Sequence, residues 1–275
     1  MPILLGAIAS VFVGISDTFG RVSSRRADSV SHVATQMLCG VVVSFPATLL
    51  VSSEFITRDV LSGALSGVFV ASGLAVVYRG MALSSAAVVS PTAAVLAALL
   101  PLVWDLIGGT SLAALEIVGC VVAIASLGLT TFNPDLGDRV RQGLILAIAG
   151  GLLFGLSIVF AADTSEASGA WPAVSQRLTG FLAMIPLALR RGAPIFLPTG
   201  VRRFGIMGGI AGAVGMVAWV IGSQRGDLGT VSVVSSTYPA VVALLAARFD
   251  DDQVRWWQAV GIGGAITGGA LIALA

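Results

Sequence analysis

The sequence of 275 residues contains no lysine, a single histidine and two cysteines, and charged residues make up only 11% of it. Arginine therefore supplies the positive charge, and the 15 basic and 14 acidic residues leave a formal net charge of +1. A balance this close to zero argues against nucleic acid as a partner. So few charges also argue against a water-soluble globular domain, whose surface needs more of them.

Side chains that support catalysis or metal binding are equally scarce. His32 follows the charged stretch at 25–28, and we expect it to be solvated at the edge of a loop. Cys39 and Cys120 each lie within an apolar run, where a thiol packs as a small hydrophobic group. No metal-ligand spacing, phosphate-binding loop or paired catalytic acid and base is found. We therefore predict a protein that is not an enzyme, with no catalytic residue, no cofactor and no metal.

The sequence is rich in long apolar segments. Hydrophobic residues make up 56% of it and its mean hydropathy is +0.98. A helix needs roughly 20 apolar residues to cross the hydrocarbon core of a bilayer. The sequence therefore predicts an all-α integral membrane protein of about ten transmembrane helices. The apolar segments lie at 3–21, 30–51, 60–78, 83–105, 112–131, 142–162, 171–189, 204–223, 229–248 and 255–274.

The chain also resembles itself. A shift of 145 residues lays Leu83–Leu100 over Leu228–Leu245 with repeated matches, while shifts of 141 and 142 pair Gly14 with Gly155 and Gly119 with Gly261. We therefore predict a first five-helix repeat at 1–133 and a second at 134–275. An odd number of helices in each repeat places the two in opposite orientations, an architecture typical of secondary transporters with a site near the bilayer midplane.

Glycine is abundant, with 34 residues, and several pairs are four residues apart. Such spacing lets transmembrane helices approach closely, although a residue this common also produces such pairs by chance. The pairs are Gly63/Gly67, Gly151/Gly155, Gly205/Gly209, Gly208/Gly212 and Gly264/Gly268.

One stretch of the second half is the most distinctive. It reads Tyr238-Pro239-Ala240-Val241-Val242-Ala243-Leu244-Leu245 and is followed by Asp252 and Gly261. With Arg177, Gly14 and Arg21 it resembles the EamA type of the drug/metabolite transporter superfamily, whose members have two five-helix halves. The sequence departs from that pattern in the first half, where Gln36 stands at the position equivalent to Arg177 and no proline corresponds to Pro239. It also has Asp252, in a run of three aspartates, where the family usually has glutamate.

Ionisable residues within the apolar segments are candidates for function because their insertion costs on the order of 2.5 to 3.5 kcal/mol. Asp17 and Arg21 share one helix face and could pair, unless the first helix ends early and leaves both solvated. Arg177 lies in the seventh segment, where we expect a structural ion pair. Arg79, at the end of the third, either snorkels to the interface or contacts substrate.

Aromatic residues supply the large apolar faces that a solute pocket needs. The resemblance implies that Tyr78, Trp104, Trp219 and Tyr238 lie on or near helices facing a central cavity; the alternative is an interfacial belt, to which we assign Trp256 and Trp257. The predicted substrate-binding residues are thus Asp17, Tyr78, Arg79, Trp104, Trp219 and Tyr238. The residues predicted to have structural or coupling roles are Arg21, Arg177 and Pro239.

The resemblance implies a secondary active or facilitative transporter in a bacterial inner membrane. It would export a small organic metabolite such as an amino acid or amine by alternating access, with proton or counter-solute coupling and the bilayer as its surroundings. Asp17 is the candidate for proton coupling because of its position within a helix. The alternatives are a non-transporting membrane scaffold and a lipid flippase or scramblase.

The arginines are unevenly distributed between the links. All except Arg58, Arg177 and Arg225 lie in or next to the odd-numbered links. The positive-inside rule places those links in the cytoplasm and both termini outside. The family resemblance implies the opposite, with both termini in the cytoplasm, so the sequence leaves the orientation open.

Overall fold

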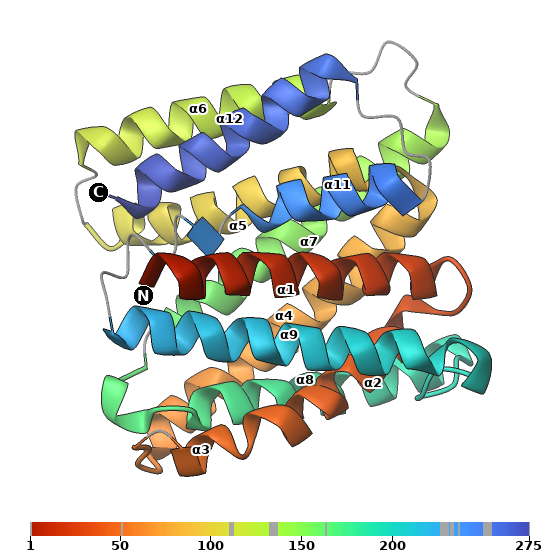
Figure 1. The fold of residues 1–275 in the computed structure, drawn as a ribbon, viewed down its shortest axis with the longest axis vertical. Helices are drawn as coiled ribbons and strands as arrows, with labels where there is room; N and C mark the ends of the chain where they lie inside the picture. Colours follow the sequence, from red (N-terminus) through yellow and green to blue (C-terminus); the bar gives the residue numbers. More distant parts are fainter. Residues whose placement is uncertain are drawn as a thin grey trace.

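A computed structural model describes residues 2–50, 52–109, 113–131, 137–162, 164–225, 231, 234–235, 237–249 and 255–274. These residues are helical apart from short links (Figure 1). The helices of the first half are α1 (Pro2–Ser24), α2 (Ser29–Ser44), α3 (Ala47–Leu50), α4 (Thr57–Leu83), α5 (Ala86–Ile107) and α6 (Ala114–Thr131). Those of the second half are α7 (Asp138–Ala162), η1 (Glu166–Ser168), α8 (Trp171–Arg191), α9 (Thr199–Arg225), α11 (Tyr238–Phe249) and α12 (Trp256–Ala273).

Within the described part of the chain, five segments are long and apolar enough to cross a membrane. They are Ile3–Ser24, Ser29–Leu50, Thr57–Leu83, Asp138–Ala161 and Thr199–Trp219. Shorter apolar helices cover Ala86–Pro101 and Ala114–Ser126. The all-helical membrane architecture predicted from the sequence is thereby confirmed, while the number of crossings stays a prediction.

Two predicted boundaries differ from the structure in informative ways. The first helix runs to Ser24, well past Asp17 and Arg21, so the alternative in which it ends early is wrong. The predicted segment 30–51 is divided at Phe45-Pro46 into α2 and α3, because proline has no N–H for the helical ladder. The run of aspartates that includes Asp252 lies outside the described residues.

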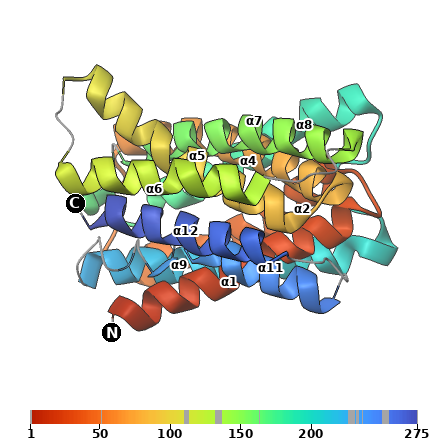
Figure 2. The same cartoon turned by 90° about the horizontal axis from the view of Figure 1, so that it is seen from above.

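The helices pack in a pattern that joins the two halves extensively. α4 packs against α7 and α8, α1 against α9, α5 against α7, and α2 against α8 and α9. α6 and α12 pair with each other at one edge of the bundle, as Figures 1 and 2 both show. The largest buried apolar cluster joins residues of α2, α4, α5, α7, α8 and α11, among them Met37, Tyr78 and Met184.

All helices run roughly along one direction, so the bundle has two ends (Figure 1). One end, on the right of Figure 1, we call the arginine-rich end. α1, α4 and α8 finish there, and α2, α5, α7, α9 and α12 begin there. Both ends of the chain lie at the opposite end, on the left.

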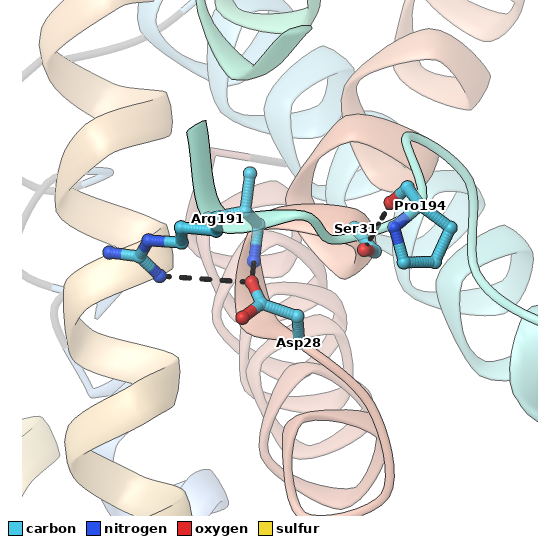
Figure 3. Close-up of polar contacts among 5 residues, drawn as sticks. Asp28, Ser31, Arg191 and Pro194 are labelled. Atoms are coloured by element: carbon cyan, nitrogen blue, oxygen red, sulfur yellow. Dashed lines mark hydrogen bonds and ion pairs between the residues drawn. The ribbon is translucent and has the colours of Figure 1, made fainter. Parts of the chain in front are cut away.

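At the arginine-rich end, polar contacts join the link after α8 to the start of α2 (Figure 3). Asp28 caps α2 by accepting from the N–H of Val30 at 2.8 Å, and Nη1 of Arg191 lies 3.7 Å from the same carboxylate oxygen. The Ser31 hydroxyl donates to the carbonyl of Pro194.

At the opposite end, hydrogen bonds join the start of α4 and the link before it to the link before α8. Asp59 accepts from the N–H of Ser165 at 2.9 Å and from its hydroxyl at 2.6 Å. The N–H of Glu54 donates to the carbonyl of Ala167 at 2.9 Å. Each end of the bundle therefore joins the first half to the second through polar contacts between links.

Candidate functional site

Asp17 lies on α1 with 9% of its surface exposed, facing Tyr78 of α4, which is fully buried. The Tyr78 hydroxyl donates a hydrogen bond of 3.0 Å to Oδ1 of Asp17. A carboxyl group at such a position in a membrane helix is costly and marks a functional site by default. The structure thus brings together two of the residues that the sequence singles out.

Gln36 of α2 connects this pair to two further helices. Its Nε2 donates to the Ser16 hydroxyl of α1 at 2.9 Å and to the Tyr78 hydroxyl at 3.3 Å. The Ser16 hydroxyl in turn donates to the carbonyl of Gly208 on α9 at 2.8 Å. A continuous hydrogen-bond network therefore crosses α1, α2, α4 and α9.

His32 packs against the same network. It is 0% exposed, its ring meets that of Tyr78 edge-on at 5.2 Å between centroids, and its Nδ1 is hydrogen-bonded to the Ser23 hydroxyl. The expectation of a solvated His32 is therefore wrong, because α2 begins three residues earlier and packs this side chain against α1 and α4. We call Ser16, Asp17, His32, Gln36 and Tyr78 the Asp17 cluster.

Two atoms of the Asp17 cluster are buried and lack a hydrogen-bond partner among the described residues, namely Nε2 of His32 and Oε1 of Gln36. Buried polar groups are ordinarily satisfied, and an unsatisfied one calls for an explanation such as a bound water or ligand. The side chains of His32 and Gln36 interact with each other, so these two atoms account for one another at least in part.

The two arginines predicted to pair with acidic residues have other contacts. Arg21, 1% exposed, donates from Nε to the carbonyl of Met81 at 3.3 Å, while Asp17 takes its hydrogen bond from Tyr78. Arg177 is 8% exposed and contacts the sulfur of Met37 and the carbonyl of Gly212. Among the described residues no acidic side chain pairs with Arg177, so the expected structural ion pair is not found there.

Of the other predicted site residues, Tyr238 lies close to the cluster. Tyr238 is the first residue of α11. Its carbonyl oxygen faces Gly14 of α1, where an added Cβ atom would lie 3.3 Å from that oxygen. Gly14 is about one helical turn from Asp17. Pro239 follows in the first turn of α11, where proline is tolerated because those N–H groups have no helical partner. Trp219 is half-buried near the end of α9 at the other end of the bundle.

Arg79 and Trp104 do not join the Asp17 cluster. Arg79 is exposed, on a different side of α4 from the buried Tyr78. Trp104 is 55% exposed and lies about 27 Å along α5 from the start of that helix. The prediction that these two residues line the same site as Asp17 is therefore not supported by the geometry.

A cavity of about 510 Å³ opens at the arginine-rich end, just beyond the Asp17 cluster. Arg21 lies between the two, since it bonds to the carbonyl of Met81 while Ala82 and Arg25 line the cavity. Asp17 and Arg21 are four residues apart and so share one face of α1, and Arg25 follows directly after the end of that helix. The full lining is Arg25, Ala82, Leu83, Ser84, Ser85, Val88, Arg139, Val140, Arg255 and Gln258.

The sequence did not identify Ser16, His32 and Gln36 as one site. The available signal was the four-residue spacing of His32 and Gln36, which puts both on one face of an apolar helix. Within the described part of the chain, no three His, Cys, Asp or Glu side chains come together as metal ligands.

The comparisons with known proteins agree with this architecture. A solved crystal structure, described only as that of a protein, aligns with 99% of this chain and 97% of its own, with a TM-score of 0.64 and 17% sequence identity. At that identity the likeness concerns the fold alone, and it includes both halves.

No curated protein matches the sequence. Residues 141–274 match the EamA-like transporter family. The chain is therefore an integral multi-pass membrane protein, and its residues 141–274 match the EamA-like transporter family, which belongs to the drug/metabolite transporter superfamily.

Proposed function

We propose that this protein moves a small organic solute across a membrane by alternating access between two inverted five-helix halves, with the Asp17 cluster as part of the solute or coupling site. The observation that carries the proposal is a buried hydrogen-bond network around a membrane-embedded carboxyl group, in a chain with a transporter-family domain.

Contacts of equivalent glycines support the duplication. A Cβ built at Gly67 of α4 would lie 2.2 Å from the carbonyl oxygen of Gln176 on α8. A Cβ built at Gly209 of α9 would lie 2.7 Å from the carbonyl oxygen of Gln36 on α2. Gly67 and Gly209 are repeat equivalents, and their partners are both glutamines on the second helix of the other half. This pairing supports Gln176 as the counterpart of Gln36, in place of Arg177.

The same contacts favour one register for the repeat in α5 and α11. Gly14 of α1 packs against Val241 and the carbonyl of Tyr238, while Gly155 of α7 packs against Leu100 and the carbonyl of Ala97. Gly155 stands 141 residues after Gly14, while Leu100 and Ala97 stand 141 residues before Val241 and Tyr238. A single shift of 141 therefore relates the two sets of contacts. The shift of 145 suggested by sequence matches alone is therefore not favoured in these helices.

The hydrogen bonds of the two glutamines are also similar. Nε2 of Gln36 donates to Ser16, and Nε2 of Gln176 donates at 2.8 Å to Ser66, which is bonded to Ser157. A shift of 141 carries Ser16 onto Ser157. Among the described residues, the first-half network includes an acid, a tyrosine and a histidine and the second-half network does not, so we place the solute or coupling function in the first. Two related halves around an asymmetric polar site are suited to exposing it alternately to each side of the membrane.

The test begins with purified protein and a thermal-shift screen against a metabolite library, because a ligand present at 100 times its Kd stabilises the folded state by about 2.7 kcal/mol. A ligand found in this way is then measured for flux in proteoliposomes, using Asp17→Asn and the control Glu166→Gln, an exposed acid on the link before α8. We expect Asp17→Asn to abolish flux or its pH dependence and Glu166→Gln to preserve both. Unchanged flux and pH dependence in Asp17→Asn would remove Asp17 from the mechanism.

We further propose export from a bacterial cell through its inner membrane, on the strength of the family resemblance. A cysteine-accessibility scan across α1, α5 and α11 separates a transporter from a membrane scaffold. A transporter exposes mid-depth positions to aqueous reagents, whereas a scaffold leaves them unlabelled.

A further inference from the structure

Each end of the bundle has a set of polar contacts that joins the two halves. At the arginine-rich end, the link after α1 and the start of α2 contact the end of α8 and the link that follows it, and this set includes the pair of Asp28 with Arg191. At the opposite end, the start of α4 and the link before it contact the link between α7 and α8, and this set includes the hydrogen bonds of Asp59 with Ser165. We call the two sets the Asp28 contacts and the Asp59 contacts.

The two sets have equivalent places in the proposed repeat, in which the short helix α3 continues α2. In each set, the link after the first helix of one half meets the link after the second helix of the other half. Those helices are α1 and α8 for the Asp28 contacts, and α7 and α2 for the Asp59 contacts. Exchanging the two halves therefore exchanges the two ends. Inverted halves that rock about a central site separate at one end while they close at the other.

The Asp59 contacts centre on a buried acid. Asp59 is 3% exposed, and it accepts hydrogen bonds from the N–H and the hydroxyl of Ser165 at 2.9 and 2.6 Å. Hydrogen bonds to an ionised carboxylate are roughly twice as strong as those between neutral groups. The N–H of Ala170 also donates to the Ser53 hydroxyl at 3.1 Å. Separating the halves at this end would leave the Asp59 carboxylate without both of its donors.

Aromatic packing adds to the closure of the same end. Trp171, the first residue of α8, meets the ring of Phe55 edge-on at 5.2 Å between centroids and the ring of Phe45 at 6.2 Å. Phe45 and Phe55 stand before and after α3, so one ring of the second half contacts the first half at two points. Opening this end would separate these rings as well as the hydrogen bonds.

The Asp28 contacts are more accessible to water. The side chains of Arg191 and Asp28 are 44% and 32% exposed, and their nitrogen and oxygen lie 3.7 Å apart. An ion pair this exposed contributes little to stability because water and salt screen it. Two neutral hydrogen bonds complete the set, one donated by the Ser31 hydroxyl and one accepted by the Thr35 hydroxyl at 3.1 Å. The cavity of about 510 Å³ opens at this end as well.

We propose that the Asp28 contacts and the Asp59 contacts are the two gates of this protein, broken in turn as the halves rock. The stronger Asp59 contacts hold the opposite end closed in the absence of solute, so that the empty protein opens more readily at the arginine-rich end. The inference rests on the proposed alternating access and names the residues that control it.

The test measures the distance between the links at each end, using the full chain in nanodiscs with no solute added. Cys39 and Cys120 are replaced by alanine, and two spin labels are placed at exposed positions at one end or the other. Pulsed electron resonance then gives the fraction of molecules in a longer-distance population. The labelled pairs are Thr57→Cys with Glu166→Cys at the opposite end and Arg26→Cys with Arg190→Cys at the arginine-rich end.

We expect Asp59→Ala to raise the longer-distance population at the opposite end about tenfold, and Ser165→Ala, which keeps the N–H donor, to raise it about threefold. The longer-distance population at the arginine-rich end should fall in parallel, because the two ends open in turn. Arg191→Gln should change the arginine-rich end by less than about twofold, since its ion pair is exposed.

The matched control is Glu54→Gln, which removes an exposed acid from the link before α4. Glu54 contacts the second half through its backbone N–H, so this variant should keep the opposite end closed. Ser165→Thr keeps both donors to Asp59 and should also keep it closed. If Asp59→Ala is poorly folded, Ser165→Ala and Ser165→Thr carry the test.

Unchanged distances at the opposite end in folded Asp59→Ala and Ser165→Ala would overturn the inference. Widening of both ends together would overturn it too, as would an equal effect of Glu54→Gln. Because the readout is distance and not flux, its failure is separate from that of the proposed function. A protein whose ends respond but which moves no solute would lose the transport proposal and keep the gates, and a protein that moves solute with unresponsive ends would do the reverse.

Discussion

Nη1 of Arg177 on α8 lies 3.7 Å from the sulfur of Met37 on α2, where these two helices cross. Glycines make the close approach possible: Gly40 lies against the aliphatic part of Arg177, and Gly180 lies against the sulfur of Met37. The guanidinium also contacts the carbonyl of Gly212 at 3.5 Å, and its Nε is buried with no hydrogen-bond partner among the residues that the structure describes. The positive charge is thus buried with weak compensation.

Replacing this charge should therefore stabilise the fold. Arg177→Met removes a poorly satisfied cation and keeps an unbranched side chain, so we expect the free energy of unfolding to rise by about 1 to 3 kcal/mol. Thermal unfolding in detergent measures this, with exposed Arg203→Met as the control. If the midpoint of Arg177→Met falls instead, the arginine is a structural support.

The glycine contacts between the two halves predict that alanine at either of two equivalent glycines destabilises the fold. Gly67→Ala and Gly209→Ala each force a methyl group against a backbone carbonyl of the facing helix, so we expect a loss of about 1 to 3 kcal/mol in each. Gly263→Ala on α12 meets nothing within 4 Å and should be neutral or stabilising, because alanine favours helix. Denaturant titration of the three variants tests this, and equal tolerance of all three contradicts it.

Tyr78 and Asp17 should be energetically coupled. Tyr78→Phe keeps the ring against His32 but removes the donor to Asp17, leaving a buried acceptor unsatisfied at a cost of about 1 to 3 kcal/mol. In a double-mutant cycle with Asp17→Asn, we expect a coupling free energy above about 0.5 kcal/mol. Additive effects of the two substitutions on unfolding would show that the hydrogen bond contributes little.

Asp28 has two roles that separate substitutions distinguish. Asp28→Asn keeps an acceptor for the N–H of Val30 and loses only the partly exposed pair with Arg191, so we expect a change of about 0.5 kcal/mol or less. Asp28→Ala also loses the helix cap, for which we expect about 1 kcal/mol. Thermal unfolding of both variants checks the order, and a larger effect of Asp28→Asn would assign the main role to the ion pair.

The arginine distribution predicts the orientation in the membrane. The arginine-rich end carries the arginines of the odd-numbered links, and the two chain ends lie together at the other end (Figure 1). The positive-inside rule then places both termini outside the cytoplasm. A reporter fused after Ala275 that is active only outside the cytoplasm measures this directly. Activity of a cytoplasmic reporter at that position would support the family orientation instead.

The predicted parts of the fold follow from local properties of the chain. Helical segments and their apolar character were read from hydropathy and length, which each stretch of sequence carries on its own. Asp17 and Tyr78 stood out because an acid and a tyrosine are uncommon within such runs, and the distinctive stretch at Tyr238–Leu245 pointed to the family that residues 141–274 match.

Which side chains meet was decided only by the tertiary structure. Tyr78 and Asp17 are 61 positions apart, and their contact depends on how α1 and α4 are rotated against each other. The same rotation buries His32, joins Gln36 to the network and turns Arg79 outward. Hydropathy does not determine these rotations, because in lipid the choice of helix neighbours depends on close packing at small residues and on hydrogen bonds between distant segments.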